Sequence, residues 1–120
     1  MRTGIDIVEV SRFKIMNEHK NTLNEVFTDY EISYIGKASN VLSRMAGLFA
    51  AKEAVLKAIG IGVYGGLKLT DIEIMHEDSG RPYVVPNKSI SKYLNELKCS
   101  GIDISISHTN SVATAICILY

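Results

Sequence analysis

The sequence is poor in cysteine, has no excess charge of either sign and contains no long apolar run. Its two cysteines, Cys99 and Cys117, have no metal-like spacing, so we expect free thiols in a reducing compartment. Lysine plus arginine equals aspartate plus glutamate, at 13 each, so overall charge gives no reason to expect a nucleic-acid partner. Any charged partner must therefore meet a local patch.

Segments that would direct the chain to a membrane are also missing. The start, Met1 to Asp6, carries charges where a signal peptide would need an apolar run, and the apolar run at residues 112–120 is too short to span a bilayer. We therefore expect a cytoplasmic protein with no membrane partner. A chain of 120 residues, 47% of them hydrophobic, is expected to form a single domain over residues 1–120.

Several signatures of catalysis are absent as well. The sequence contains no glycine-flanked serine elbow, no Cys–His signature and no His-x-x-x-His zinc spacing. The glycine-rich segment 60–66 matches neither a P-loop nor a dinucleotide fingerprint. It is interpreted either as a flexible connection or as backbone that approaches a ligand closely.

Hydrophobic periodicity and capping residues predict the secondary structure. Thr28 and Glu31 match the capping-box pattern, and Asn40 can cap the helix that follows. His76, at the end of a predicted hairpin, is expected to be a surface residue without a role. We expect strands at 3–8, 69–77, 82–85, 103–108 and 112–120, and helices from residue 11, over 29–36, over 46–60 and around 90–97. This order predicts an α+β fold with a mostly antiparallel sheet packed with helices.

The predicted helix at residues 46–60 carries charges in an alanine-rich context. Phe49, Glu53 and Lys57 fall on one stripe at spacing i, i+4, i+8, and Gly60 supplies a stop. One interpretation is a Glu53–Lys57 pair on a solvated face, which would contribute about 0.2–0.5 kcal/mol. The alternative is that these charges have a function.

Two further polar positions bear on that choice. Asp6 interrupts an apolar strand, so it needs a cation, a metal or an exposed face. His108 follows Ser107 at a strand end and is either a structural histidine or a functional donor. Asp6 and Glu53, without soft ligands nearby, suggest a hard cation such as Mg²⁺ that also binds substrate phosphate, with Lys57 beside that phosphate.

The chain resembles the holo-acyl-carrier-protein synthases, the small bacterial type of 4′-phosphopantetheinyl transferase. The resemblance rests on Gly4-Ile-Asp-Ile-Val-Glu-Val-Ser-Arg12, Phe49-Ala-Ala-Lys-Glu-Ala-Val-Leu-Lys57, Asp71-Ile-Glu-Ile74, Gly80-Arg-Pro82 and Ser105-Ile-Ser-His-Thr109. It implies transfer of the phosphopantetheine arm of coenzyme A to a serine of apo-acyl carrier protein, releasing adenosine 3′,5′-bisphosphate. This reaction supplies holo-acyl carrier protein to fatty acid biosynthesis, a part of lipid metabolism.

The resemblance also implies roles for individual residues. Asp6 and Glu53 match the metal-binding acids, and Lys57 matches the phosphate-facing lysine. The attacking hydroxyl belongs to the carrier protein, which explains why no activated serine or cysteine is needed. The implied catalytic residues are Asp6, Glu53, Lys57 and His108, and the implied coenzyme A contacts are Lys57, Gly60, Arg81, His108 and Thr109.

Three further expectations concern partners and assembly. An acidic carrier protein is expected to meet a basic patch of Arg12, Lys14 and Arg44. Leu48 stands where the family commonly has an arginine, and Arg44, one turn back, could partly replace it. The resemblance further implies a homotrimer with active sites between subunits, while a non-catalytic module that binds coenzyme A or an acyl carrier protein is the alternative function.

Overall fold

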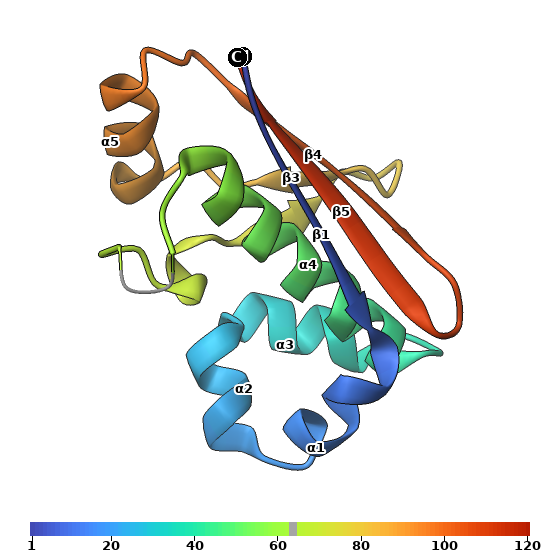
Figure 1. The fold of residues 1–120 in the computed structure, drawn as a ribbon. Coiled ribbons are helices and arrows are strands. Elements are labelled where there is room, and N and C mark those ends of the chain that lie inside the picture. Colours follow the sequence, from blue (N-terminus) through green and yellow to red (C-terminus); the bar gives the residue numbers. More distant parts are fainter. Residues whose placement is uncertain (63–64) are drawn as a thin grey trace.

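An antiparallel sheet of three strands packs against one long helix (Figure 1). The computed structural model describes residues 1–62 and 65–120, so Val63 and Tyr64 of the glycine-rich segment lie outside the described residues. The sheet has the order β1-β5-β4, and the long helix is α4. Their bounds are Arg2–Glu9 for β1, Ile102–His108 for β4, Val112–Leu119 for β5 and Val41–Ile59 for α4.

A two-stranded antiparallel sheet and several shorter helices surround this pair of layers. The small sheet consists of β2, Ile74–His76, and β3, Pro82–Val84. The remaining elements are the 3₁₀-helices η1, Val10–Arg12, and η2, Leu69–Asp71, with α1, Phe13–Asn17, α2, Lys20–Val26, α3, Asp29–Gly36, and α5, Lys88–Glu96. The predicted α+β fold with antiparallel sheets is confirmed.

The helix boundaries follow the capping residues. The Thr28 hydroxyl accepts from the Glu31 backbone N–H, and the Glu31 carboxylate accepts from the Thr28 N–H, which completes the capping box of α3. Asn40 caps α4 by accepting from the N–H of Ser43. Gly60 ends α4 with a φ of 89°, a left-handed conformation that suits glycine.

The helix predicted over residues 46–60 begins five residues earlier, at Val41, and two further predicted elements differ in kind. The helical pattern from Ser11 divides into η1, α1 and α2, with an extended backbone at His19. This break allows Phe13 from α1 and Leu23 from α2 to reach the same core.

The predicted strand over residues 69–77 begins only at Ile74, because the preceding residues form η2. The carbonyl oxygens of Leu69 and Ile72 accept hydrogen bonds of 2.9 and 2.7 Å from the ammonium of Lys52. Lys52 itself is fully buried in α4 and also binds Glu31 at 2.7 Å. This polar contact inside the core overrides the alternating sequence pattern.

Small side chains set how α4 lies on the sheet. Helix α4 packs on β1 and β5, and β5 contributes buried Ala113 and Ala115 to the core. The buried alanines of α4 are Ala46, Ala50, Ala51, Ala54 and Ala58. A β-carbon on Gly4 of β1 would overlap the backbone of Ala54 and Ala58, so only glycine permits this approach. Strand β1 and helix α4 are thereby in direct backbone contact.

Among residues 1–62 and 65–120, no helix or strand covers the opposite face of the sheet along β1. Ile5, Ile7 and Ile116 on that face are exposed to 63%, 69% and 38%. Among the described residues, no helix has both the length and the hydropathy to cross a membrane.

Candidate functional site

The site forms where β1 passes along α4 in the opposite direction. Gly4 contacts the helix at Ala54 and Ala58, and Asp6, two residues further, faces the same helix. The Nζ atom of Lys57 lies 3.0 Å from the Asp6 Oδ1 atom and 3.0 Å from the Ile5 carbonyl oxygen. The strand and the helix therefore bring Asp6 and Lys57 together, as the sequence suggested.

Asp6 is held by hydrogen bonds to its backbone and to one carboxylate oxygen, but its second carboxylate oxygen lacks a hydrogen-bond partner among the described residues. Its side chain is 14% exposed, and its backbone oxygen accepts from the Thr114 hydroxyl at 2.8 Å. Within the described part of the chain, its buried Oδ2 atom has no hydrogen-bond partner. A buried carboxylate oxygen without a partner is costly, so a hydrogen-bond donor or a cation at this atom would be stabilising.

Glu53 lies close enough to Asp6 for the Asp6 charge to change the pKa of Glu53. Burial raises the pKa of the Glu53 carboxyl, and the negative charge of Asp6 raises it further, against smaller opposing effects of Lys57 and Arg12. The negative charge of Asp6 therefore disfavours ionisation of Glu53. Lys57 meets Asp6 on another element, so the isolated Glu53–Lys57 pair considered from the sequence does not describe this site.

The donor set suits a hard cation that takes only part of its coordination from protein. Within residues 1–62 and 65–120, no group of three or more His, Cys, Asp or Glu side chains could hold a metal ion. Two carboxylates, one with a free buried oxygen, match Mg²⁺, which commonly keeps waters and binds substrate phosphates. The residues present therefore fit such an ion.

Arg12 borders this cluster from η1. Its guanidinium carbon lies 5.9 Å from the ring centre of Phe13 and 5.8 Å from that of Phe49. The two rings meet edge to face at 5.2 Å. The two rings hold the Arg12 charge on the side of α4 that carries Glu53. This charge opposes part of the rise in the Glu53 pKa.

His108 and Thr109 lie away from the carboxylates, at the end of β4. Strand β5 separates them from β1, since His108 pairs with Ala113 and Ala113 pairs with Val8. Two strand spacings of about 4.8 Å each therefore separate the edge strands. The exposed His108 ring has its Nδ1 atom 3.3 Å from the Thr109 carbonyl oxygen.

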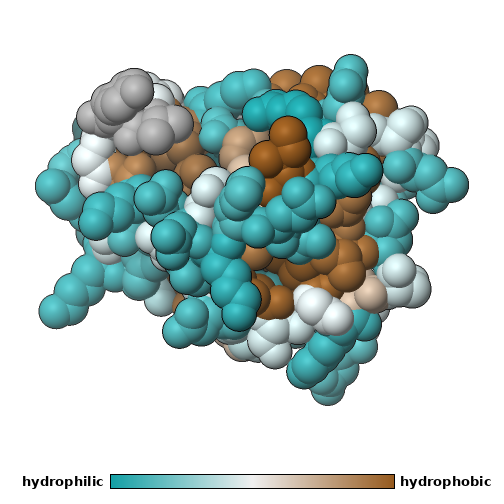
Figure 2. All heavy atoms as spheres, turned by 90° about the horizontal axis from the view of Figure 1, so that it is seen from below, coloured by the Kyte–Doolittle hydropathy of each residue, from teal (hydrophilic) through white to brown (hydrophobic). Residues whose placement is uncertain are grey.

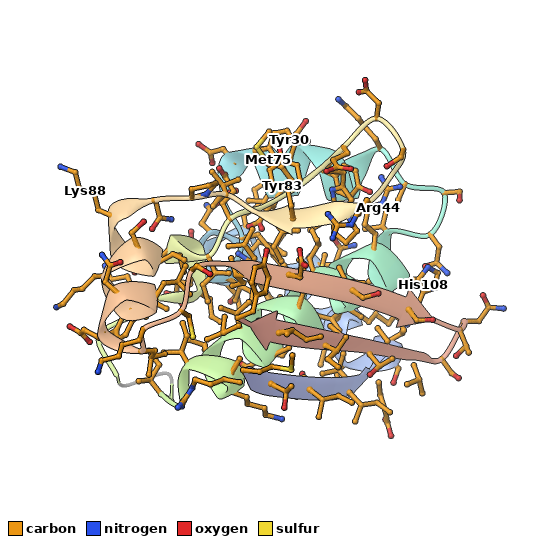
Figure 3. The ribbon with its side chains drawn as sticks, turned by 90° about the horizontal axis from the view of Figure 1, so that it is seen from above. Tyr30, Arg44, Met75, Tyr83, Lys88 and His108 are labelled. Atoms are coloured by element: carbon orange, nitrogen blue, oxygen red, sulfur yellow. The ribbon has the colours of Figure 1, made fainter. Side chains whose placement is uncertain are left out.

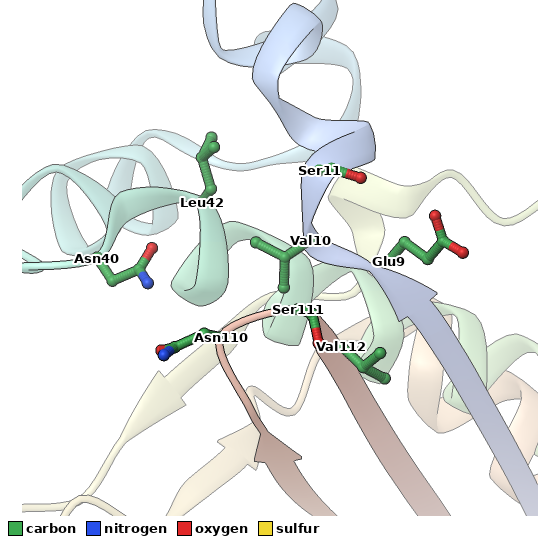
Figure 4. A pocket seen from close by; sticks show the side chains of 8 residues that line it. All are labelled: Glu9, Val10, Ser11, Asn40, Leu42, Asn110, Ser111 and Val112. Atoms are coloured by element: carbon green, nitrogen blue, oxygen red, sulfur yellow. The ribbon is translucent and has the colours of Figure 1, made fainter.

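A pocket of about 610 Å³ opens beside this turn (Figure 4). Residues from three places in the sequence line it: the end of β1 with η1, the start of α4, and the β4–β5 turn. Asn40, Asn110 and Ser111 contribute polar groups, whereas Asp6 and Glu53 are not part of its lining. The pocket and the carboxylate cluster are separate features of one chain.

The other predicted residues are distributed more widely. Arg81 pairs with Asp103 at 3.1 Å, and Gly60 ends α4. Lys14 is exposed on α1. Arg44 lies 4.0 Å over the Tyr34 ring and donates to the Tyr34 carbonyl oxygen, so its guanidinium is already engaged (Figure 3 shows its position and that of His108).

The sequence patterns did not predict the contacts of three polar residues. The buried ion pair of Lys52 with Glu31 was not predicted, although the alanines around Lys52 indicated that it faces the core. The hydrogen bond of Arg2 to the end of α4 was not predicted either. His76 was expected to be a plain surface residue, but it stacks on Tyr34 at 4.1 Å and is partly buried.

The sequence and the structure were compared with those of known proteins. The profile of the 4′-phosphopantetheinyl transferase superfamily matches residues 2–117. A holo-[acyl-carrier-protein] synthase of Fusobacterium nucleatum is 41% identical over 117 residues, which cover 97% of this chain and 95% of that protein.

Solved structures agree with the sequence comparison. The holo-[acyl-carrier-protein] synthase of Neisseria meningitidis has a TM-score of 0.88 at 28% identity, covering 99% of this chain and 97% of that one. The enzyme of Bacillus anthracis, solved in complex with coenzyme A (3′,5′-ADP), has a TM-score of 0.80 at 30% identity, covering 98% and 94%.

Proposed function

Because this chain belongs to the 4′-phosphopantetheinyl transferase superfamily, we propose that Asp6, Glu53 and Lys57 form the phosphate end of its active site. The protein is a holo-[acyl-carrier-protein] synthase, which transfers the 4′-phosphopantetheine moiety of coenzyme A to a serine of apo-acyl carrier protein. The observation that carries the proposed site is the Asp6–Lys57 contact beside Glu53, with one Asp6 oxygen left free.

The bond changes assign simple tasks to these residues. The serine oxygen forms a bond to the phosphorus that bears the pantetheine arm, the bond from that phosphorus to adenosine 3′,5′-bisphosphate breaks, and the serine proton is released. A Mg²⁺ ion held by Asp6 and Glu53 would bind the pyrophosphate and neutralise its charge. Lys57 is 54% exposed at the helix end, so its ammonium can move from Asp6 to a phosphate oxygen.

We assign the nucleotide end of coenzyme A to His108 and Thr109, with Gly60 and Arg81 as further contacts. His108 lies on the opposite edge strand from Asp6, so both can serve one coenzyme A most simply when they come from different subunits. The pocket beside Asn110 would then receive the nucleotide. The exposed isoleucines on the uncovered sheet face, Ile5, Ile7 and Ile116, support assembly of the chain into the homotrimer that the sequence suggested.

Docking of the carrier protein is proposed at α1 and η1. This end of the molecule, seen in Figure 2, carries apolar side chains gathered among polar ones. Ile15 is 69% exposed on α1, with Lys14 exposed next to it and Arg12 on the preceding turn. An exposed apolar side chain near cations suits an acidic partner that also presents apolar surface. Arg44, already bound to Tyr34, would contribute less.

Mass spectrometry of apo-acyl carrier protein, incubated with coenzyme A, Mg²⁺ and this protein, tests the function. The expected result is addition of one phosphopantetheine per carrier protein. Binding of coenzyme A without any mass increase would identify a non-catalytic module instead.

The Asp6→Ala and Glu53→Ala variants test the site assignment. Each should lose at least about 10³-fold in turnover, because the cation loses one of its two protein ligands. Circular dichroism should show retained secondary structure. Near-normal turnover in either variant, or full activity of the wild type in EDTA, would overturn the metal assignment.

A further inference from the structure

Two side chains tie β1 to the last turn of α4: Lys57, which reaches Ile5 and Asp6, and Arg2, the first residue of β1. The Nε atom of Arg2 donates to the Ala58 carbonyl oxygen at 2.9 Å, and its Nη2 atom donates to the Ile59 oxygen at 3.2 Å. Carbonyl groups at a helix C-terminus lack partners within the helix and favour positive charge. Arg2 satisfies two of them from a different element.

Gly60 leaves the space that the guanidinium uses. A β-carbon at this position would lie 2.9 Å from the Arg2 Nη2 atom. The backbone of Gly60 also has the left-handed conformation that side chains disfavour. Arg2 and Gly60 thus fit together at one end of the contact between strand and helix.

The packing surface by itself resists sliding poorly. Helix α4 meets the sheet largely through alanines, including Ala54 and Ala58, against Gly4 and the alanines of β5. Helices are normally located by ridges of larger side chains that enter grooves. Alanine ridges are shallow, so a small shift of α4 along β1 changes the apolar area buried between these two elements little, and polar ties between them help to fix the axial position.

The axial position decides the geometry of the carboxylates. Asp6 lies four residues beyond Arg2 on β1, and Glu53 lies five residues before Ala58 on α4. A shift of α4 along its axis by the rise of one helical residue would move Glu53 by about 1.5 Å relative to Asp6. Misplacement of catalytic groups by about 1 Å can reduce rates 10²-fold.

We propose that Arg2 is a positioning residue of the transferase, which fixes α4 against β1 and thereby the spacing between Asp6 and Glu53. Arg2 binds Ala58 and Ile59 and acts on the reaction only through the register of the two elements. The inference rests on the proposed function for the roles of Asp6 and Glu53. The tie between strand and helix is independent of that function.

The experiment compares Arg2→Ala and Arg2→Lys with Asn87→Ala. Asn87 caps the distant helix α5 by accepting from the Ile90 N–H and also donates to the Asp71 carbonyl oxygen, so its loss matches the loss of a helix-end tie. The measurements are the melting temperature, kcat, and the Kd for Mn²⁺ with coenzyme A present, the last by electron paramagnetic resonance. Both Arg2→Ala and Asn87→Ala should lower the melting temperature by a few degrees.

Only the Arg2 variants should change the site. We expect Arg2→Ala to lower kcat about 10- to 100-fold and to weaken Mn²⁺ binding about tenfold. Arg2→Lys should restore part of both, since an ammonium can still donate to the last carbonyls. If Arg2→Ala does not fold, Arg2→Lys is compared with the control alone, and an intermediate loss of kcat and Mn²⁺ affinity supports the proposal.

The failures are distinguishable. If kcat and Mn²⁺ affinity of the Arg2 variants stay within twofold of Asn87→Ala, Arg2 is only a helix cap and the inference is wrong. If the wild type transfers no phosphopantetheine, the proposed function is wrong. The Mn²⁺ affinities would then still decide whether Arg2 positions the two carboxylates.

Discussion

At the scale of single residues, the position of Arg12 suits two roles, docking of the carrier protein and support of the Glu53 carboxylate. Its guanidinium lies over Phe13 and Phe49, where its charge affects the pKa of Glu53, and it borders the exposed helix α1. Docking and support of the carboxylate are both consistent with this position. Kinetics with each substrate varied in turn can separate them.

We predict that Arg12→Glu lowers kcat/KM for the carrier protein about tenfold or more, chiefly by raising KM, because like charge would meet an acidic partner. The salt dependence should become flatter, and KM for coenzyme A should barely change. Arg12→Gln serves as the matched variant that removes the charge without reversing it. An equal loss toward both substrates would assign Arg12 to the nucleotide site instead.

His76 illustrates how a titratable side chain can couple a hairpin to a helix. It stacks on Tyr34 of α3 at 4.1 Å, and Arg44 lies over the same tyrosine. Burial lowers the pKa of His76, and the charge of Arg44 lowers it further. The neutral imidazole is therefore the form that fits this stack.

This arrangement predicts a pH dependence of stability. As pH falls below about 6.5, the unfolded chain takes up a proton at His76 before the folded chain does, so stability present above that pH is lost as pH falls through the lower pKa of the folded state. The His76→Gln variant should lose less in melting temperature between pH 8 and pH 5.5 than the wild type. Equal losses in both proteins would show that His76 does not contribute.

At the scale of elements, the buried pair of Lys52 and Glu31 joins α4 to α3. Burial lowers the pKa of Lys52, against the opposing effect of Glu31. Glu31 also accepts from the backbone N–H groups of Thr28 and Ile74, so its carboxylate serves three segments. The pair fixes the positions of α3, α4 and the start of β2 relative to one another.

Removing the lysine alone should therefore be severe. We predict that Lys52→Met costs about 3–5 kcal/mol in the free energy of unfolding, because Glu31 would remain buried without its cation. The double variant Lys52→Met with Glu31→Gln should recover part of this loss, since no buried charge remains. Urea denaturation of the two variants measures the difference, and equal stability of the single variant and the wild type would contradict the prediction.

Local sequence signals predicted the elements whose causes are local. The Thr28–Glu31 capping box and the Asn40 cap gave the starts of α3 and α4, and Gly60 gave the end of α4. The strand expected from Leu69 failed for a non-local reason, because Lys52, 17 residues away, draws the Leu69 carbonyl oxygen inward. Sequence patterns do not report such contacts.

In the candidate site, too, local sequence signals pointed to individual residues, whereas the contacts between distant segments could not be predicted. Asp6 and Glu53 were proposed as site residues because an unpaired carboxylate in an apolar segment is costly to bury. Their meeting depends on Gly4, whose missing side chain lets β1 touch α4, and on Arg2, which the sequence alone did not distinguish from an ordinary surface charge. The roles assigned to Asp6, Glu53, Lys57, His108 and Thr109 stay predictions.

At the scale of the whole molecule, the uncovered sheet face predicts assembly. Ile7 on β1 is exposed to 69%, and so is Ile15 on α1, which provides a matched pair of apolar surface residues. We predict that Ile7→Asp yields monomers in sedimentation at micromolar concentration with loss of activity and intact secondary structure, because a buried aspartate would oppose subunit contact. Ile15→Asp should leave the sedimentation mass unchanged. A fully active monomeric wild type would refute the shared site.

During folding, the ammonium of Lys52 must exchange its water for three oxygen atoms on segments far apart along the chain: Glu31, Leu69 and Ile72. Helix α4 therefore cannot dock fully while any of these segments is missing, because the lysine would be dehydrated with only part of its hydrogen bonds in place. On the ribosome, the first 60 residues should remain incompletely packed until Ile72 has emerged. Core formation and chain completion are thus coupled, and a stable folded fragment that ends with α4 is not expected.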